Sequence, residues 1–137
     1  MADNKTVLLR AIENFGKSET RQKYFDLYDD GAVLRGYAGV EPGLESIKQF
    51  YAQFWTAFPD AQITVEDLIE ADDKVACRFV VNATHGGNFM GVPATGKPVA
   101  LPGITILRFA NGKCVERWSQ ADFLSAMVQI GAIPMPS

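Results

Sequence analysis

Hydrophobic residues follow a helical period in the first half of the chain and a strand period in the second. A first amphipathic helix is predicted over residues 3–15, where apolar side chains recur at every third or fourth position before Gly16. A second, shorter helix is predicted to begin after Ser18 and to end in a turn at residues 29–31. Residues 32–38, which glycines bound, then suggest a short strand.

The strongest helical pattern covers residues 44–58 and carries five aromatic side chains on one face. Pro59 ends this helix, because the residue before a proline avoids the helical region and proline has no backbone N–H. Two interpretations of the aromatic stripe stay open. Its rings pack against a sheet as core, or some of them, Tyr51 and Trp55 especially, wall an apolar pocket.

Four longer strands are predicted beyond this helix, and they follow one another as hairpins. They cover residues 61–71, 75–85, 99–109 and 113–120. Asn111-Gly112 favours a type I′ turn between the last two strands, and Pro102-Gly103 favours a bulge. A short apolar helix is predicted to begin at Phe123 and to end before Gly131.

Helices that stand apart from an antiparallel sheet indicate the α+β class. The sheet is expected to curve around the long aromatic helix and to form a cone, which the N-terminal helices close at one end. With 137 residues, of which 47% are hydrophobic, the chain is expected to form one domain over residues 1–137 with a core of its own.

The net charge and the reactive residues limit the classes of function that are expected for this chain. The net charge is −3 and the Lys and Arg residues are scattered, so no nucleic-acid partner is expected. Charged residues interrupt the N-terminal segment, and no later run approaches about 20 apolar residues, so a cytoplasmic protein without membrane contact is expected. Cys77 and Cys114 are expected to be reduced and packed. With His85 as the single histidine, neither a metal site nor a cofactor is expected.

Three groups of residues, most of them in the second half of the chain, form one pattern. They are Arg78-Phe79 with residues 84–97, residues 111–118 with Asp122, and Gln129-Ile130-Gly131. This pattern resembles the SnoaL-like polyketide cyclases, within the nuclear transport factor 2-like cone fold. Family members include aldol-type cyclases of polyketide methyl esters, hydroxylase relatives without that activity, and proteins without an assigned function. The resemblance therefore implies the fold more firmly than the reaction.

Asp122 is the first candidate catalytic residue. In the family's cyclases the Asp four residues after a Trp is the proposed acid/base, and the resemblance places that role at Asp122. Those cyclases also carry an assisting histidine on the strand before the final hairpin, but residues 99–109 contain none. An alternative stays open, in which Asp122 only caps the closing helix. Capping bonds stabilise the charged carboxylate, whereas an apolar pocket destabilises it.

The expected ligand is a small apolar molecule that contains a carbonyl group. Asp122 would remove a proton next to the carbonyl, and Gln120 or His85, the second catalytic candidate, would stabilise the enolate oxygen. Alternatively, His85 is a strand-end histidine without a role in the pocket. The expected substrate-binding residues are Trp118, Gln120, Tyr51, Phe54, Trp55, Phe58 and Phe89. The alternative function is a non-catalytic small-ligand binder or a dimeric scaffold of the same fold.

Strand alternation separates two faces of residues 113–120. One face carries Glu116, Trp118 and Gln120, and the other carries Val115, Arg117 and Ser119. Trp118 is interpreted as pocket lining, with core packing as the alternative, and Val115 and Arg117 are interpreted as outward positions. A homodimer that pairs sheet to sheet is expected, because one broad face of the sheet lacks a cover and relatives of this fold commonly pair in this way.

Overall fold

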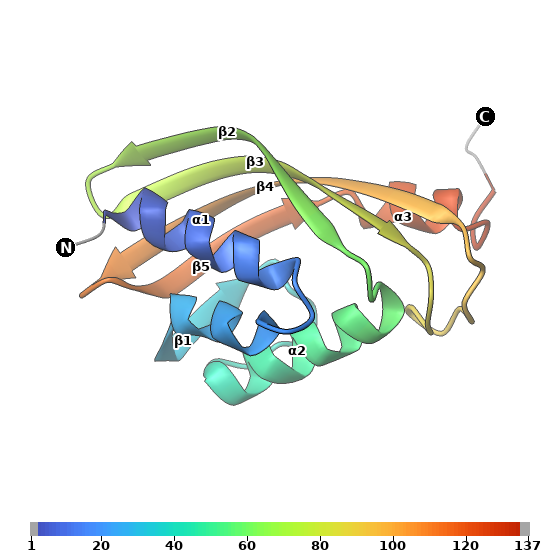
Figure 1. Ribbon diagram of the computed structural model, residues 1–137, viewed down its shortest axis with the longest axis horizontal. Coiled ribbons are helices and arrows are strands. Elements are labelled where there is room, and N and C mark those ends of the chain that lie inside the picture. The colour runs from blue at the N-terminus through green and yellow to red at the C-terminus, as the bar shows by residue number, and fades with distance from the viewer. Residues whose placement is uncertain (1–2, 135–137) are drawn as a thin grey trace.

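The computed structural model describes residues 3–134, and the ends of the predicted domain 1–137 lie outside the described residues. The elements in chain order are α1 (Asn4–Phe15), the 3₁₀ helix η1 (Arg21–Leu27), β1 (Tyr28–Arg35), α2 (Leu44–Ala57), β2 (Gln62–Ala71), β3 (Lys74–Thr84), β4 (Pro98–Ala110), β5 (Lys113–Ala121) and α3 (Phe123–Gln129). The strands form a curved layer above α1 and α2 (Figure 1). The predicted α+β class with a curved sheet is confirmed.

The five strands form one sheet in the order β1-β5-β4-β3-β2. Strands β2 to β5 pair antiparallel as consecutive hairpins, whereas β1 lies parallel to β5 at the edge of the sheet. Asn111 and Gly112, between β4 and β5, have φ angles of 53° and 78°, as a type I′ turn requires. The hairpin order is therefore confirmed, and β1 adds a parallel edge strand to it.

The segment before α2 differs from the prediction. The second helix is a 3₁₀ helix, and β1 begins at Tyr28, so residues 29–31 lie inside a strand and not in a turn. Tyr28 pairs with Cys114 of β5, and its side chain is only 1% exposed. Pairing along β5 and burial of this aromatic ring override the turn propensity of the Asp and Gly residues that follow.

The bulge predicted at Pro102-Gly103 is wrong. Gly103 instead lets the ring of Phe79 and the backbone of Gln120 pack closely against β4. Strands β3 and β4 pair without a break along their whole length. A Cβ at Gly103 would lie 2.6 Å from the ring of Phe79 and 3.1 Å from the carbonyl oxygen of Gln120. Glycine is needed here because no other residue leaves room for that ring.

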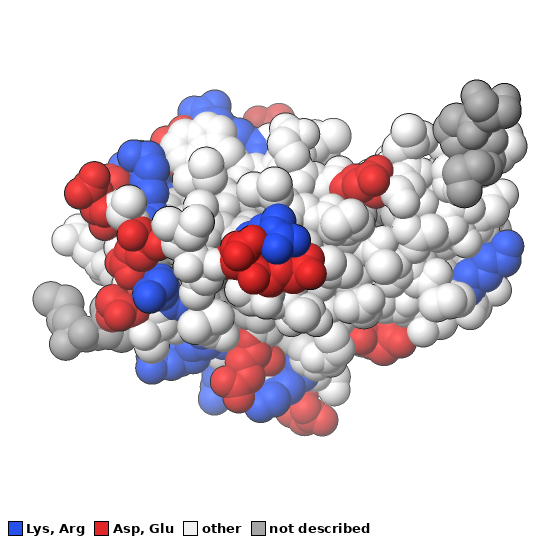
Figure 2. Space-filling view, turned by 90° about the horizontal axis from the view of Figure 1, so that it is seen from above, with Lys and Arg blue, Asp and Glu red and all other residues white. Residues whose placement is uncertain are grey.

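The outer face of the sheet, which points away from α1 and α2, carries several exposed apolar side chains. Figure 2 views the molecule from this side, and uncharged residues cover most of the view. Arg78 points outward and forms ion pairs with Glu66 and Asp67. The large exposed apolar side chains of this face are Ile69, Ile104 and Ile106, at 64%, 56% and 39% exposure.

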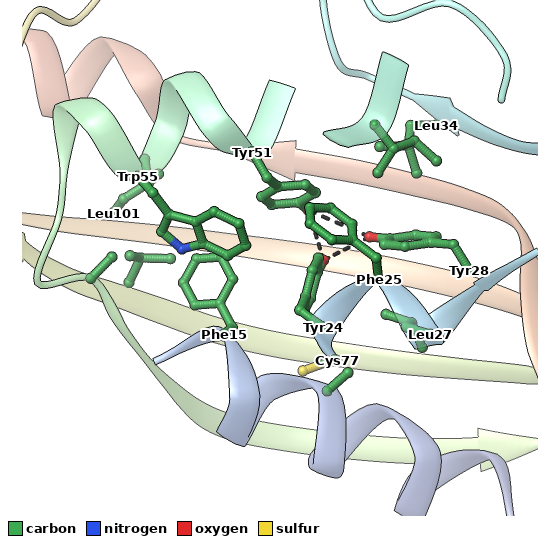
Figure 3. Packing of buried hydrophobic residues seen from close by; sticks show 14 of the residues in the cluster. Phe15, Tyr24, Phe25, Leu27, Tyr28, Leu34, Tyr51, Trp55, Cys77 and Leu101 are labelled. Carbon is green, nitrogen blue, oxygen red and sulfur yellow. Dashed lines mark hydrogen bonds between the residues drawn. The ribbon is translucent and has the colours of Figure 1, made fainter. Parts of the chain in front are cut away.

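Aromatic rings from three helices fill the space beneath the sheet (Figure 3). The ring centroids of Phe15 and Trp55 are 5.3 Å apart, and those of Tyr24 and Tyr51 are 4.8 Å apart. Tyr51 and Trp55 of α2 are only 6% and 8% exposed. The stripe of α2 therefore forms core at these two positions.

We expect the turn after β1 to tolerate no side chain at Gly36. Gly36 and Gly39 both have left-handed φ angles, 86° and 77°, but only a Cβ at Gly36 would collide with the carbonyl oxygen of Ser119 in β5. Gly39→Ala should cost about 1 kcal/mol from its φ angle alone. Gly36→Ala should cost about 3 kcal/mol or more, because β1 must also move away from β5.

Urea unfolding of the two variants and the wild type measures this difference. Gly39→Ala is the matched control, since an added Cβ there meets no described atom within 4 Å. Equal free energies of unfolding for the two variants would contradict the close packing of the turn on β5.

Candidate functional site

The two faces of β5 carry different chemistry. Arg117 and Ser119 point into the space beneath the sheet and are each 8% exposed, whereas Gln120 is exposed on the outer face. The prediction that Arg117 points outward is therefore wrong. A bulge in β5 near Arg108 and Phe109 of β4 changes the alternation, and hydroxyl groups inside the core provide partners for the guanidinium.

A groove of about 340 Å³ opens where β5 leads into α3. Asp122 and Gln120 both line this groove. Phe79 of β3 and Ile104 of β4 also line it. The remaining lining residues are Glu66, Arg78, Pro102, Gly103 and Ala121. An apolar wall with a few polar groups is typical of sites for small molecules.

Asp122 caps α3 and is solvent-exposed. Its Oδ1 accepts a hydrogen bond of 3.0 Å from the backbone N–H of Ser125, and its own N–H donates to the carbonyl oxygen of Pro102. Its Oδ2 makes no hydrogen bond with any residue from 3 to 134. The cap thus holds one carboxylate oxygen and leaves the other free.

A second cavity lies beneath the sheet, between the C-terminal half of α2 and α3. It is lined by apolar residues, namely Phe54, Phe58, Val81, Ala83, Phe89, Val99, Leu101 and Ala126. Its volume is about 10 Å³, which is about enough for a single water molecule. Three of the expected substrate-binding residues, Phe54, Phe58 and Phe89, therefore share an apolar cavity, but it is filled almost completely by their own rings.

His85 is fully buried beside this second cavity. Its ring packs against Phe58 and Phe89, with centroids 5.9 and 6.4 Å away. Its Nδ1 accepts a hydrogen bond of 3.3 Å from the backbone N–H of Thr95 and lies 2.9 Å from Thr95 Oγ1. Its Nε2 has no partner among the described residues. The histidine is thus held in the strand-end loop, away from Asp122.

The structure brings some of the expected site residues together and separates others. Asp122 and Gln120 share the groove on the outer face. Tyr51 and Trp55 lie in the core beneath the sheet. Trp118 is half-buried opposite Ile106 on the outer face, on the other side of the sheet from the rings of α2. Asp122, Trp118 and the rings of α2 therefore do not form one cavity.

The core contains a cluster of polar groups that the sequence patterns did not predict. The Nη1 of Arg117 donates hydrogen bonds to the hydroxyl groups of Tyr28 at 2.7 Å and Tyr24 at 3.0 Å, and its Nε donates to Thr105 Oγ1 at 2.8 Å. The hydroxyl groups of Tyr24 and Tyr51 are 2.9 Å apart (Figure 3). The available signal was the spacing of Tyr24 and Tyr28, one helical turn apart, with an arginine in an otherwise strand-like run.

All four tyrosines of the chain belong to this cluster or border it. The hydroxyl groups of Tyr37 and Ser119 form a hydrogen bond of 2.9 Å. The ring of Tyr37 lies 6.0 Å from the guanidinium carbon of Arg117. Burial raises the pKa of each of the four phenols, and Arg117 offsets only part of that effect. The phenols are therefore neutral at physiological pH.

Comparison with known proteins identifies the family. The sequence model of the SnoaL-like polyketide cyclases matches residues 6–130. The chain belongs to this family. The predicted cone of the nuclear transport factor 2-like fold is thereby confirmed. The comparison with curated proteins gave no match.

Solved structures of this fold resemble the SnoaL-like protein over almost its whole length. AclR from Streptomyces galilaeus, a proposed hydroxylase, is 28% identical with a TM-score of 0.86, over 100% of this chain and 86% of AclR. IdmH from Streptomyces antibioticus, a proposed polyketide cyclase, is 28% identical with a TM-score of 0.79, over 95% of this chain and 99% of IdmH. TsrD from Streptomyces laurentii, at 21% identity and a TM-score of 0.82 over 97% of this chain and 99% of TsrD, supports the fold alone. The reaction does not follow from these likenesses, since two relatives of equal identity are assigned different chemistry.

Neither a metal cluster nor a membrane-spanning helix occurs in the part of the chain that the structure describes. No three His, Cys, Asp or Glu side chains of residues 3–134 come together in a way that could hold a metal ion. No helix of those residues is long and apolar enough to cross a membrane. Cys77 and Cys114 are both free and buried, and burial raises the pKa of the Cys114 thiol to about 11. The absence of a cofactor, a nucleic-acid partner and any membrane contact stays a prediction.

We expect the tyrosines to ionise only as the protein unfolds. In the unfolded chain a phenol has a pKa of about 10, and burial raises the pKa of all four in the folded state. The folded state then keeps protons that the unfolded state loses, so stability is constant below pH 10 and falls above it. Each phenol contributes a slope of about 1.4 kcal/mol per pH unit.

Ultraviolet absorbance of tyrosinate, followed together with circular dichroism during an alkaline titration, tests this expectation. The two signals should change in the same pH range. Tyrosinate that forms near pH 10 with the secondary structure intact would show that the cluster is open to solvent.

Proposed function

We propose that this SnoaL-like protein is a cofactor-independent acid/base enzyme of the polyketide cyclase type, with Asp122 as its base. Its substrate is a small apolar compound that contains carbonyl groups. One observation carries the proposal: Asp122 and Gln120, the candidate base and the candidate donor to an enolate oxygen, line the same groove. The exposed side chain of Ile104 provides part of the apolar surface that such a ligand would cover.

The reaction is an intramolecular aldol cyclisation. The free Oδ2 of Asp122 takes a proton from the carbon next to a carbonyl group, and the amide N–H of Gln120 donates a hydrogen bond to the enolate oxygen that forms. The enolate carbon then attacks a second carbonyl carbon of the same molecule. The resulting alkoxide takes the proton back from Asp122, so the carboxylate is regenerated and no co-reactant is consumed.

Ligand binding must make Asp122 a stronger base. A carboxylate in water is a weak base toward carbon. An apolar ligand in the groove would exclude water from the carboxylate and destabilise its charged form. The apolar lining of the groove supports this step.

A second candidate function is a non-catalytic ligand-binding or scaffold protein of the same fold. Two observations favour it: Asp122 Oδ1 already caps α3, and β4 contains no histidine at the place where the family's cyclases are described with one. In that case Asp122 would serve the stability of α3 alone.

Asp122→Asn separates the two candidates. Asparagine caps a helix about as well as aspartate, so the free energy of unfolding should stay within about 0.5 kcal/mol of the wild type. Without a carboxylate, turnover of a panel of small aromatic polyketide esters should fall by about 100-fold or more, while ligand affinity is kept. Product formation followed by mass spectrometry gives the rate.

Asp3→Asn is the matched control, because Asp3 caps α1 through the N–H of Thr6 at 2.8 Å and lies outside the groove. The control should keep full turnover. Equal turnover in Asp122→Asn and in the control would leave only the ligand-binding or scaffold function.

We also propose that the protein is a homodimer in which two outer sheet faces meet, and that it resides in the cytoplasm. The exposed Ile69 and Ile106, on either side of Ala76 of β3, provide an apolar surface of the kind that is typical of the central part of an interface. Arg108 and Arg35, both paired with Glu116, border this surface and provide a polar rim.

We expect Ile106→Glu to produce a monomer, because a dimer would bury this carboxylate without a partner. Leu9→Glu, at an exposed position of α1 that is 43% exposed against 39% for Ile106, is the matched control and should remain dimeric. Light scattering measures the mass of each variant and of the wild type. A monomeric wild type at tens of micromolar would reject the dimer.

A further inference from the structure

Arg117 carries a positive charge into the core without a negative partner. Its side chain is 8% exposed, and no carboxylate of residues 3–134 lies within ion-pair distance of it. Glu116, its neighbour in sequence, lies on the opposite face of β5 and pairs with Arg35 at 2.6 Å and Arg108 at 3.3 Å. An arginine stays charged in proteins, so the core contains an uncompensated cation.

The hydrogen bonds of the cluster satisfy two of the three guanidinium nitrogens. Nε donates to Thr105, and Nη1 donates to Tyr24 and Tyr28. The phenols are also bonded to one another, with 2.7 Å between the hydroxyls of Tyr24 and Tyr28. Nη2 donates to no residue from 3 to 134.

Nη2 borders accessible space. Three polar side-chain atoms without partners are completely enclosed in the described part of the chain, on Thr20, Trp55 and His85, and Nη2 is not one of them. The ring of Tyr37, which is partly exposed, lies 6.0 Å from the guanidinium carbon. The remaining exposure of Arg117 is therefore consistent with a small opening at Nη2.

We propose that Arg117 binds a monovalent anion at Nη2, either free chloride or the carboxylate group of a small organic acid. A guanidinium nitrogen with two free N–H groups is a strong donor for an anion. The hydroxyl groups of Tyr37 and Ser119 belong to the same polar cluster, since Ser119 Oγ lies 2.9 Å from Tyr37 Oη and 2.7 Å from Thr105 Oγ1, and they can rotate their protons. The bound anion compensates the buried positive charge, which neutral hydroxyls solvate only in part.

This site is separate from the groove of Asp122. Arg117 points beneath the sheet, and Asp122 and Gln120 line the groove on the outer face. The anion site therefore does not rest on the proposed enzymatic function, and loss of one leaves the other in place. The competing explanation is that the ring of hydroxyls alone stabilises the guanidinium, and that Nη2 binds only water.

Thermal unfolding in titrations of sodium chloride and sodium acetate tests the proposal. An anion that binds only the folded state raises Tm in proportion to the logarithm of its concentration, by about 5 °C for each tenfold increase above Kd. We expect this rise in the wild type and not in Arg117→Lys, which keeps the charge but lacks Nη2. The same titration of the variant removes the general effect of salt on stability.

The two salts distinguish the two sources of the anion. A rise with both salts identifies a site that free chloride fills, and a rise with acetate alone identifies a site for organic carboxylates. The absence of any rise in the wild type up to about 300 mM of either salt would overturn the proposal, as would an equal rise in Arg117→Lys.

A second measurement keeps the test decisive if Arg117→Lys fails to fold. Wild-type crystals soaked in sodium bromide should show an anomalous peak at hydrogen-bond distance from Nη2 of Arg117. Tyr37→Phe, which removes one adjacent hydroxyl and keeps the ring, should lower the occupancy of that peak. A density map without bromide beside Nη2 would overturn the proposal.

Discussion

The hydrogen bonds of Arg117 are the constraint on which the rest of the structure depends. They join β5 to β4 through Thr105, to η1 through Tyr24 and to β1 through Tyr28, and Tyr51 of α2 completes the ring of hydroxyls. A buried cation tolerates very few arrangements, because each lost hydrogen bond leaves a desolvated polar group. The cluster therefore specifies how the two layers of the domain meet, whereas apolar rings alone would allow small shifts.

The inward position of Arg117 also determines what the outer face offers. Because side chains alternate along a strand, an inward Arg117 and Ser119 leave Trp118 and Gln120 on the outer face. The groove at Asp122 depends on this orientation of β5, because Gln120 lines the groove from the outer face. The cavity between α2 and α3, in contrast, is filled almost completely by aromatic rings and has room for about one water molecule. The polar chemistry of the groove and the polar chemistry of the core thus lie on opposite sides of one strand.

The sequence predicts the fold well, because its strongest signals are local. The aromatic stripe over residues 44–58 and the Asn111-Gly112 turn appear in the structure as α2 and the β4–β5 hairpin. The predictions are wrong where distant contacts decide: β1 starts at Tyr28 because that residue pairs with β5. The inward position of Arg117 could not be predicted either. Its hydrogen-bond partners come from segments far apart in the chain, and no local pattern shows that their hydroxyl groups meet.

The site could be predicted only in part for a related reason. The sequence points to Asp122 and Gln120 as individual residues, but which strand face encloses a cavity depends on the bulge in β5 and on Arg117. Trp118 and the rings of α2 were therefore expected in one cavity, although the sheet lies between them. Strand alternation gives two faces and leaves open which of them points inward.

The cap at Asp122 restricts the chemistry that the groove can perform. The bond from Ser125 N–H to Oδ1 holds the carboxylate in place and keeps Oδ2 available, which favours precise positioning of a base. The same bond commits Oδ1 to the cap, so only Oδ2 can take a proton from the ligand. A base restrained in this way can act on carbon acids whose C–H lies between two carbonyl groups, because their enolates are stabilised by delocalisation over both oxygens. A substrate with an isolated ketone would need a stronger base than this arrangement provides, so the proposed activity is matched to polycarbonyl compounds.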